Sequence, residues 1–154
     1  MITKAATLEQ INILYKNKSL DKQGDEKLRE NDIYIFKNES QSAVARVKNQ
    51  RYELLKDIKF GKDFKALNME QNVFMNYLRD DEIKCVVCTG DAGTGKTIIT
   101  MAFAYDAMMN GTYQNVIISR PPVSPSRKFD TGFKPGTLDE KMKPWLQIFY
   151  DNIG

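Results

Sequence analysis

The spacing of hydrophobic positions divides the chain into two parts with different patterns. In the first part, residues 7–18 (TLEQINILYKNK) place four apolar side chains on one helical face, which predicts a short amphipathic helix. That face consists of Leu8, Ile11, Leu14 and Tyr15. The charged stretch SLDKQGDEKLREN predicts a solvated connection, so we interpret residues 1–31 as a helix and its connection.

Three runs of alternating apolar residues come next: DIYIFK, SAVARVK and RYELLK. A period of two is typical of half-buried strands, and the short polar links NESQ and NQ fit hairpin turns. We therefore expect a small antiparallel β meander over residues 32–56, in a module that spans residues 32–60.

From residue 61 onward the pattern alternates between helices and strands. Residues 69–79 carry an apolar helical face, with Asn68 as the expected N-cap. KCVVCT, at residues 84–89, predicts a strand covered on both faces, because its apolar residues are consecutive. KTIITMAFAYDAMMN predicts a helix closed by Gly111, and NVIIS predicts a second strand at residues 115–119. This β-α-β order predicts a right-handed crossover and a parallel sheet with helices on both faces.

The two cysteines form a C-x-x-C pair, Cys85 and Cys88, inside the first expected strand. Positions three apart on a strand point to opposite faces, so the two sulfurs are poorly placed to bond or to share a metal. Zinc would also need two further ligands. We expect both to be ordinary buried cysteines.

The amino-acid composition limits the partners and the catalytic mechanisms that are possible for this chain. The chain has 154 residues, 42% of them hydrophobic, which is enough for one domain, or one small domain plus part of another. A formal charge of +3 leaves nucleic acid open as a partner without requiring it. The sequence has no apolar run of membrane-spanning length and no export signal, which predicts a cytoplasmic protein that does not enter a membrane. Histidine is absent, which excludes Ser-His and Cys-His nucleophiles within this chain.

The glycine-rich stretch GDAGTGKT, at residues 90–97, matches the phosphate-loop pattern G-x-x-x-x-G-K-[ST] between an expected strand and an expected helix. Glycines let main-chain amides wrap an anion, and the helix N-terminus favours negative charge. Lys96 is expected to reach the β- and γ-phosphates and Thr97 to ligate Mg²⁺, which makes these two the catalytic candidates. The remaining nucleotide-binding candidates are Gly90, Asp91, Ala92, Gly93, Thr94, Gly95 and Ile98. A glycine-rich turn with a coincidental Lys-Thr pair is the alternative.

Gln71 lies one expected helix ahead of this loop, in LNMEQNVFMNYL. An amide side chain can pair with the N6 and N7 edge of adenine, so Gln71 would make the nucleotide ATP. A solvated surface side chain is the alternative. The pattern LNxxQ resembles the Q motif of superfamily-one helicases.

Together, NMEQ, GDAGTGKT and the segment SRPPVSPSRKFDTGFKPGTLDEKMKPWLQIFYDNI resemble the PhoH-like family of phosphate-starvation-inducible ATPases. The resemblance covers about residues 30–154. It implies an α/β, RecA-like P-loop NTPase core, with ATP and Mg²⁺ as cofactors and a helicase-like role in RNA metabolism. Residues 61–154 would then be the N-terminal part of the ATPase domain.

The prolines after the second expected strand place Arg120, Arg127 and Lys128 on a stiff loop at the sheet edge where ligands bind. A solvated basic surface and a grip on the phosphates of single-stranded RNA or DNA are both compatible with this loop.

An apolar strand ending in an acid, which P-loop ATPases use to hold Mg²⁺, does not follow Thr97 in this sequence. We therefore expect a partial core truncated before that motif, with nucleotide binding rather than hydrolysis by this chain alone. The strand edge left open predicts a homo-oligomer or assembly with a chain that completes the fold. A non-catalytic nucleotide-binding partner of full-length relatives is the main alternative function. A small-molecule kinase also shares the loop but needs neither Gln71 nor the segment RPPV.

Overall fold

The computed structural model describes residues 1–119 of the 154-residue chain. The chain divides into two compact units, Met1–Asp57 and Ile58–Gly154, of which the second is described as far as residue 119. Each unit has its own cluster of buried hydrophobic side chains.

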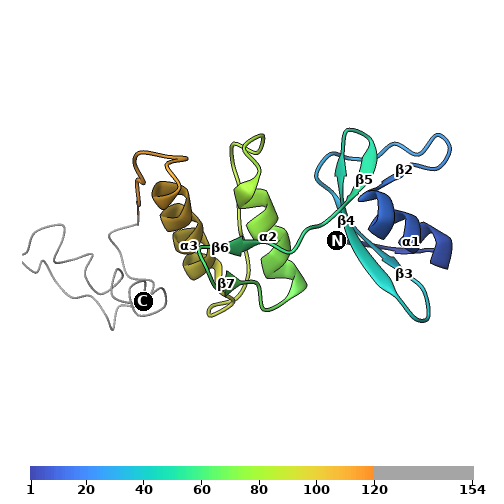
Figure 1. The fold of residues 1–154 in the computed structure, drawn as a ribbon, viewed down its shortest axis with the longest axis horizontal. Helices are drawn as coiled ribbons and strands as arrows, with labels where there is room; N and C mark the ends of the chain where they lie inside the picture. The colour runs from blue at the N-terminus through green and yellow to red at the C-terminus, as the bar shows by residue number, and fades with distance from the viewer. Residues whose placement is uncertain (120–154) are drawn as a thin grey trace, which may run out of the picture. The chain divides into compact units, whose positions relative to one another are not determined.

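The first unit is a five-stranded mixed sheet with one helix (Figure 1). Its elements are β1 (Ile2–Ala5), α1 (Leu8–Asn17), β2 (Ser19–Asp21), β3 (Ile33–Lys37), β4 (Ser42–Lys48) and β5 (Arg51–Leu54). The strand order is β1-β3-β4-β5-β2, and only the β1–β3 pair is parallel. The meander expected over residues 32–56 is confirmed as β3, β4 and β5.

Local turn chemistry explains the register of the meander. Lys48 pairs with Arg51, so Asn49 and Gln50 form a two-residue hairpin, with φ values of 50° and 58°. Positive φ at both central residues matches the right-handed twist of the flanking strands. At the other hairpin, the Asn38 carboxamide oxygen accepts hydrogen bonds from the main-chain N–H groups of Ser40 and Gln41.

Helix α1 confirms the expected amphipathic helix and packs on the sheet. Its N-terminus has a capping box in which Thr7 and Gln10 each accept a main-chain hydrogen bond from the other. Ile11 and Leu14 are fully buried in a cluster with side chains of β3, β4 and β5. The sheet contributes Phe36, Ala43, Ala45, Val47 and Tyr52 to that cluster.

Residues 19–31 are more ordered than a solvated connection. They begin with β2, and Leu28 is only 3% exposed. The Gln50 side chain accepts a hydrogen bond from the Leu28 N–H and donates one to its carbonyl, at 3.2 and 2.7 Å. Leu20 and Leu28 stand eight positions apart among charged and polar residues, which is too weak a pattern to show this burial.

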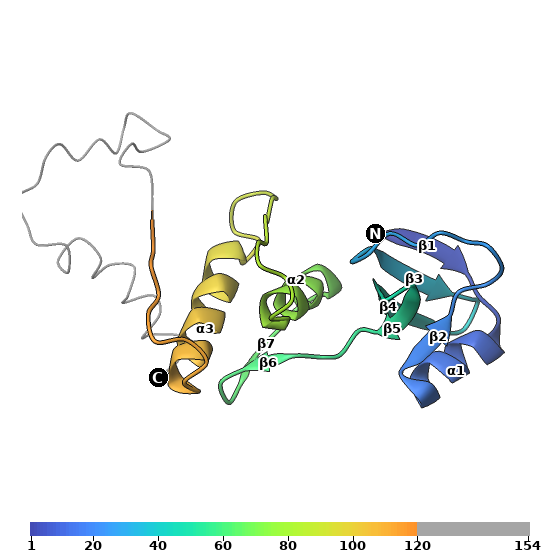
Figure 2. The same cartoon turned by 90° about the horizontal axis from the view of Figure 1, so that it is seen from above.

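The second unit contains a short hairpin, β6 (Lys59–Phe60) with β7 (Phe64–Lys65), and two helices, α2 (Met69–Arg79) and α3 (Lys96–Met109) (Figure 2). Both helices were expected, and Asn68 caps α2 as predicted. Phe60, Met75, Ile99 and Ala102 form the buried cluster.

An ion pair links the two helices of the second unit. Arg79 of α2 and Asp106 of α3 lie 2.9 Å apart, and the same Asp106 carboxylate accepts the Gly61 N–H at 2.8 Å. Arg79 also donates to the Lys59 carbonyl. Four groups from the hairpin and both helices are thereby linked.

The strands expected at residues 84–89 and 115–119 are not formed in the described part of the chain. A strand is stabilised by its ladder of hydrogen bonds to neighbours, and within residues 1–119 neither segment has one. Val87 and Ile117 are accordingly 82% and 93% exposed, and Cys85 and Cys88 are exposed rather than buried. The expectation of core cysteines is therefore wrong for this structure.

The fold class itself is α/β, as expected: a partial P-loop NTPase core preceded by a small, largely antiparallel β module. None of the helices described in residues 1–119 has both the length and the apolar character needed to cross a bilayer.

Candidate functional site

The glycine-rich loop leads directly into the N-terminus of α3. Gly95 is the N-cap, with φ of 90°, and Gly93 has φ of 79°, a region that favours glycine. No side chain caps this end of α3. The main-chain N–H groups in the first turn of a helix have no hydrogen-bond partners within the helix. They point outward from its N-terminus, and this arrangement binds anions.

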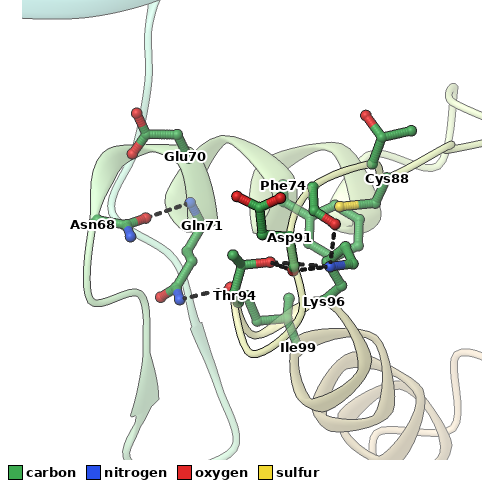
Figure 3. Close-up of a pocket in the computed structure, with 11 residues that line it drawn as sticks. Asn68, Glu70, Gln71, Phe74, Cys88, Asp91, Thr94, Lys96 and Ile99 are labelled. Atoms are coloured by element: carbon green, nitrogen blue, oxygen red, sulfur yellow. Dashed lines mark hydrogen bonds between the residues drawn. The ribbon is translucent and has the colours of Figure 1, made fainter.

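Lys96 holds the loop in its curved shape from inside (Figure 3). Its Nζ atom donates to the carbonyl oxygens of Gly90 and Asp91, at 2.8 and 2.5 Å, and to the Thr94 hydroxyl at 3.1 Å. The Thr94 hydroxyl in turn donates to the Asp91 carbonyl at 2.9 Å. An ammonium group has three donors, so two of them hold main-chain carbonyls and the third holds a side-chain hydroxyl.

Gln71 reaches the same loop from α2. It stands three positions after the N-cap Asn68, whose side chain accepts the Gln71 N–H at 2.9 Å. The Gln71 carboxamide oxygen accepts the Leu67 N–H at 2.8 Å, and its nitrogen donates to the Thr94 carbonyl at 3.2 Å (Figure 3). The residue predicted to read the base therefore contacts the phosphate loop.

A pocket of about 330 Å³ lies between the N-terminal half of α2 and the loop, within the size range of small-ligand sites. The pocket is lined by the Lys96 ammonium, by carboxamide and carboxylate side chains, and by apolar side chains (Figure 3). The lining residues are Asn68, Glu70, Gln71, Phe74, Cys88, Thr89, Gly90, Asp91, Thr94, Lys96 and Ile99.

Five sequence-predicted residues therefore meet in one pocket: Gln71, Gly90, Asp91, Thr94 and Lys96. Thr97 lines a second cavity of about 490 Å³, together with Lys96 and apolar residues of α2 and α3. The other predicted loop residues belong to the loop and the first turn of α3 without lining the first pocket: Ala92, Gly93, Gly95 and Ile98. Arg120, Arg127 and Lys128 lie outside the described residues.

Six pocket residues were not among the predicted site residues: Asn68, Glu70, Phe74, Cys88, Thr89 and Ile99. A signal for one of them was present, because residues three apart share a helix face, which places Phe74 beside Gln71. Asn68 was recognised only as a cap. Its position next to a loop-contacting glutamine depends on the approach of α2 to the loop, which no local pattern encodes.

The side chains near the loop include few of the oxygen ligands that magnesium prefers. Within residues 1–119, no three carboxylate or cysteine side chains gather in a way that could hold a metal ion by themselves. Mg²⁺ beside a nucleotide needs few protein ligands, since it keeps several waters and takes phosphate oxygens. The exposed hydroxyl of Thr97, one residue after Lys96, fits that need.

The loop, its lysine and the helix that follows have the arrangement typical of P-loop proteins. A family model described as "PhoH-like protein" matches residues 63–154, which is more than half of the chain. The chain belongs to this family and is a PhoH-like protein of the P-loop ATPase type.

Curated relatives agree with the family match. Protein PhoH2 of Bacillus subtilis (strain 168) is 34% identical over 87 residues, which are 56% of this chain and 19% of that protein. A PhoH-like protein of the same organism is 34% identical over 101 residues, 66% of this chain and 30% of its own length. A PhoH-like protein of Mycobacterium tuberculosis (strain ATCC 25618 / H37Rv) is 35% identical over 93 residues, 60% of this chain and 25% of its own length.

The chain thus spans less than a third of the length of these relatives. No solved structure matches it significantly.

Proposed function

We propose that this chain binds ATP, together with Mg²⁺, in the pocket between α2 and the phosphate loop. The observation that carries the proposal is the position of the Lys96 ammonium. It lies inside a loop of eight residues at the uncapped N-terminus of α3, held by two main-chain carbonyls. A cation and open helix N–H groups at one point are complementary to a phosphate chain.

In this proposal, different groups of the chain contact the phosphates and the Mg²⁺ ion. The main-chain N–H groups from Gly93 to Thr97 donate to phosphate oxygens. Lys96 turns its third donor from the Thr94 hydroxyl to a phosphate oxygen and keeps its two loop contacts. Thr97 holds Mg²⁺ through its hydroxyl, and that ion would neutralise charge on the phosphates.

We propose that Gln71 faces the base. Two of its four hydrogen-bonding positions are used by Leu67 and Thr94, which leaves one N–H and one oxygen lone pair. That remaining donor and acceptor match the N7 acceptor and the N6 donor of adenine. A guanine edge presents two acceptors there and would leave the Gln71 oxygen without a partner.

The role in RNA metabolism rests on the family alone. We propose ATP hydrolysis coupled to single-stranded RNA or DNA as the activity to which this ATP site contributes, with Arg120, Arg127 and Lys128 as the residues that contact nucleic acid. These three residues are basic and lie in a proline-containing segment of the sequence, which supports the proposal.

The ATP proposal is tested by calorimetric titration of Mg-ATP into the wild-type chain and a Lys96→Ala variant. Lys96→Ala removes a charge-assisted contact worth about 3 kcal/mol, so affinity should fall by about 100-fold. Lys62→Ala serves as the matched control, since Lys62 is an exposed lysine in the β6–β7 turn. Equal affinity of the Lys96→Ala and wild-type chains would reject the proposal.

A further inference from the structure

The phosphate loop and α2 meet through one side chain, Gln71. Its carboxamide nitrogen lies 3.2 Å from the Thr94 carbonyl, and a Cβ placed on Gly95 would come within 2.9 Å of that same nitrogen. The amide therefore packs directly against the peptide unit that joins Thr94 to Gly95. From this placement we infer that Gln71 is a positioning residue for the phosphate loop. It acts on the phosphates through the Thr94–Gly95 peptide, and this role is separate from any contact with the base.

The geometry of a peptide unit sets the direction of the Gly95 N–H. A trans peptide is planar, and its C=O and N–H bonds point in opposite directions. Because Gln71 holds the Thr94 carbonyl, the N–H of Gly95 points away from Gln71. Gly95 is the N-cap of α3 and the loop has no side-chain cap there, so this N–H belongs to the group that an anion would contact.

Without that hydrogen bond, the Thr94–Gly95 peptide would be free to turn. Gly95 offers little resistance, because glycine populates both signs of φ with similar ease. A turned peptide would aim the Thr94 carbonyl, an acceptor, at the phosphates and remove one donor from them. Gln71 prevents this by holding the Thr94 carbonyl.

Two further hydrogen bonds of Gln71, at the N-terminus of α2, fix its orientation toward the loop. Its oxygen accepts the Leu67 N–H at 2.8 Å, and the Asn68 cap accepts the Gln71 N–H at 2.9 Å. The bond from Leu67 fixes the carboxamide at the N-terminus of α2, with its N–H₂ group toward the loop, and the bond to the Asn68 cap holds the Gln71 main chain there (Figure 3). The same side chain therefore ties the start of α2 to the start of α3.

The inference rests on the proposed phosphate binding, and inorganic tripolyphosphate separates it from base recognition, because this probe has neither base nor ribose. Calorimetry on the full chain should give an affinity for tripolyphosphate about tenfold weaker in Gln71→Ala, the loss of one hydrogen bond. Gln71→Met, which keeps most of the side-chain volume, should show the same loss.

Gln10→Ala is the matched control. Gln10 also stands three residues after an N-cap, and its carboxamide also accepts a main-chain N–H, but in α1 of the first unit. Its removal should leave tripolyphosphate affinity within about twofold of wild type. A general effect of weakened helix capping would instead lower affinity in both variants.

A spectroscopic readout distinguishes positioning from stability. In ligand-free protein at a temperature well below unfolding, Gln71→Ala and Gln71→Met should shift the amide resonance of Gly95, because the peptide loses its fixed plane. Gln10→Ala should not shift it. Folded variants with an unchanged Gly95 resonance and wild-type tripolyphosphate affinity would overturn the inference while leaving ATP binding intact. A wild-type chain that binds neither tripolyphosphate nor ATP would overturn the proposed function together with it.

Discussion

The Lys96 ammonium and the Thr94 hydroxyl lie 3.1 Å apart. Two N–H groups of the ammonium donate to loop carbonyls, and the third donates to this hydroxyl. The hydroxyl is itself fixed, because it donates to the Asp91 carbonyl. The loop is thus held in shape by its own atoms before any ligand arrives. A phosphate would replace a contact between the ammonium and a neutral hydroxyl by one between two opposite charges, which is the stronger of the two.

The two glycines Gly95 and Gly111 offer a matched pair of substitutions. Both have positive φ, 90° and 71°, so alanine strains the backbone at either site by about 1 kcal/mol. A Cβ at Gly111 meets nothing within 4 Å, whereas a Cβ at Gly95 meets Gln71 at 2.9 Å. Gly95→Ala should therefore weaken Mg-ATP binding by about tenfold or more, and Gly111→Ala by less than about twofold. Equal affinities in a calorimetric comparison would contradict this account of Gly95.

Base recognition by Gln71 makes a separate prediction about nucleotide preference. If the remaining donor and acceptor of Gln71 pair with adenine, Gln71→Ala should reduce the preference for ATP over GTP by about tenfold. The ratio of the two dissociation constants is the quantity to compare between wild type and variant. A ratio that stays constant, even if both affinities fall, would remove the base-reading role and leave only loop positioning.

Local patterns were enough to predict the three helices, the meander and the glycine-rich loop that leads into α3. Helical spacing around Ile11, the cap at Asn68 and the run from Gly90 to Thr97 are all encoded by residues close in sequence. The missed features depend on distant partners. β1 pairs with β3 across some thirty residues, and Leu28 is buried because Gln50 holds its main chain. Cys85 and Cys88 were expected inside a sheet, but a strand pattern predicts burial only when neighbouring strands are present.

The ion pair between Arg79 and Asp106 should contribute to the stability of the second unit. Asp106 is 8% exposed and accepts from both Arg79 and the Gly61 N–H, so Asp106→Ala leaves two donors without that acceptor. Arg79 is partly exposed, which reduces the loss to about 2 kcal/mol. Urea unfolding should show this decrease, while Asp63→Ala, at an exposed carboxylate of the β6–β7 turn, should change stability by less than about 0.5 kcal/mol. Equal stabilities of these two variants would contradict the structural role of the pair.

A second polar cluster predicts how the first unit responds to acid. Glu26 accepts from Lys4 at 2.7 Å and from Tyr52 at 3.0 Å. The hydrogen bond from Lys4 lowers the pKa of Glu26 below its ordinary value of 4.5, against the opposing effect of burial. A folded pKa below the unfolded one stabilises the fold at pH above the unfolded value, and that stability is lost as pH falls through the folded value.

Unfolding of the first unit, followed through amide resonances of β4 and β5, should therefore become easier as pH drops below about 4.5. Glu26→Gln should flatten this acid limb, whereas Glu39→Gln, at an exposed turn position, should leave it unchanged. An acid limb of the same size in the wild type and in Glu26→Gln would show that the cluster does not contribute.

The same cluster predicts a decrease in stability at alkaline pH. Burial alone would lower the pKa of Lys4, but its hydrogen bonds to Glu26 and Tyr52 outweigh that effect and raise the pKa above 10.5. Burial is the main cause that raises the pKa of Tyr52 above 10.0. For raised values the stabilisation is complete below the unfolded pKa and is lost as pH rises through the folded one. Lys4→Met should remove the Lys4 contribution to this alkaline dependence in the same resonance measurement, and the Tyr52 contribution should remain, because burial is its main cause.

The central claim is that main-chain amides at the start of α3, together with Lys96, hold a triphosphate. Crystals of the chain grown with excess ATP and Mg²⁺ test it most directly. The account predicts phosphate oxygens against the N–H groups of residues 93–97, with Lys96 bonded to one of them and the Thr94 hydroxyl displaced. A nucleotide bound elsewhere, or a loop still closed on the Thr94 hydroxyl under saturating ATP, would contradict it.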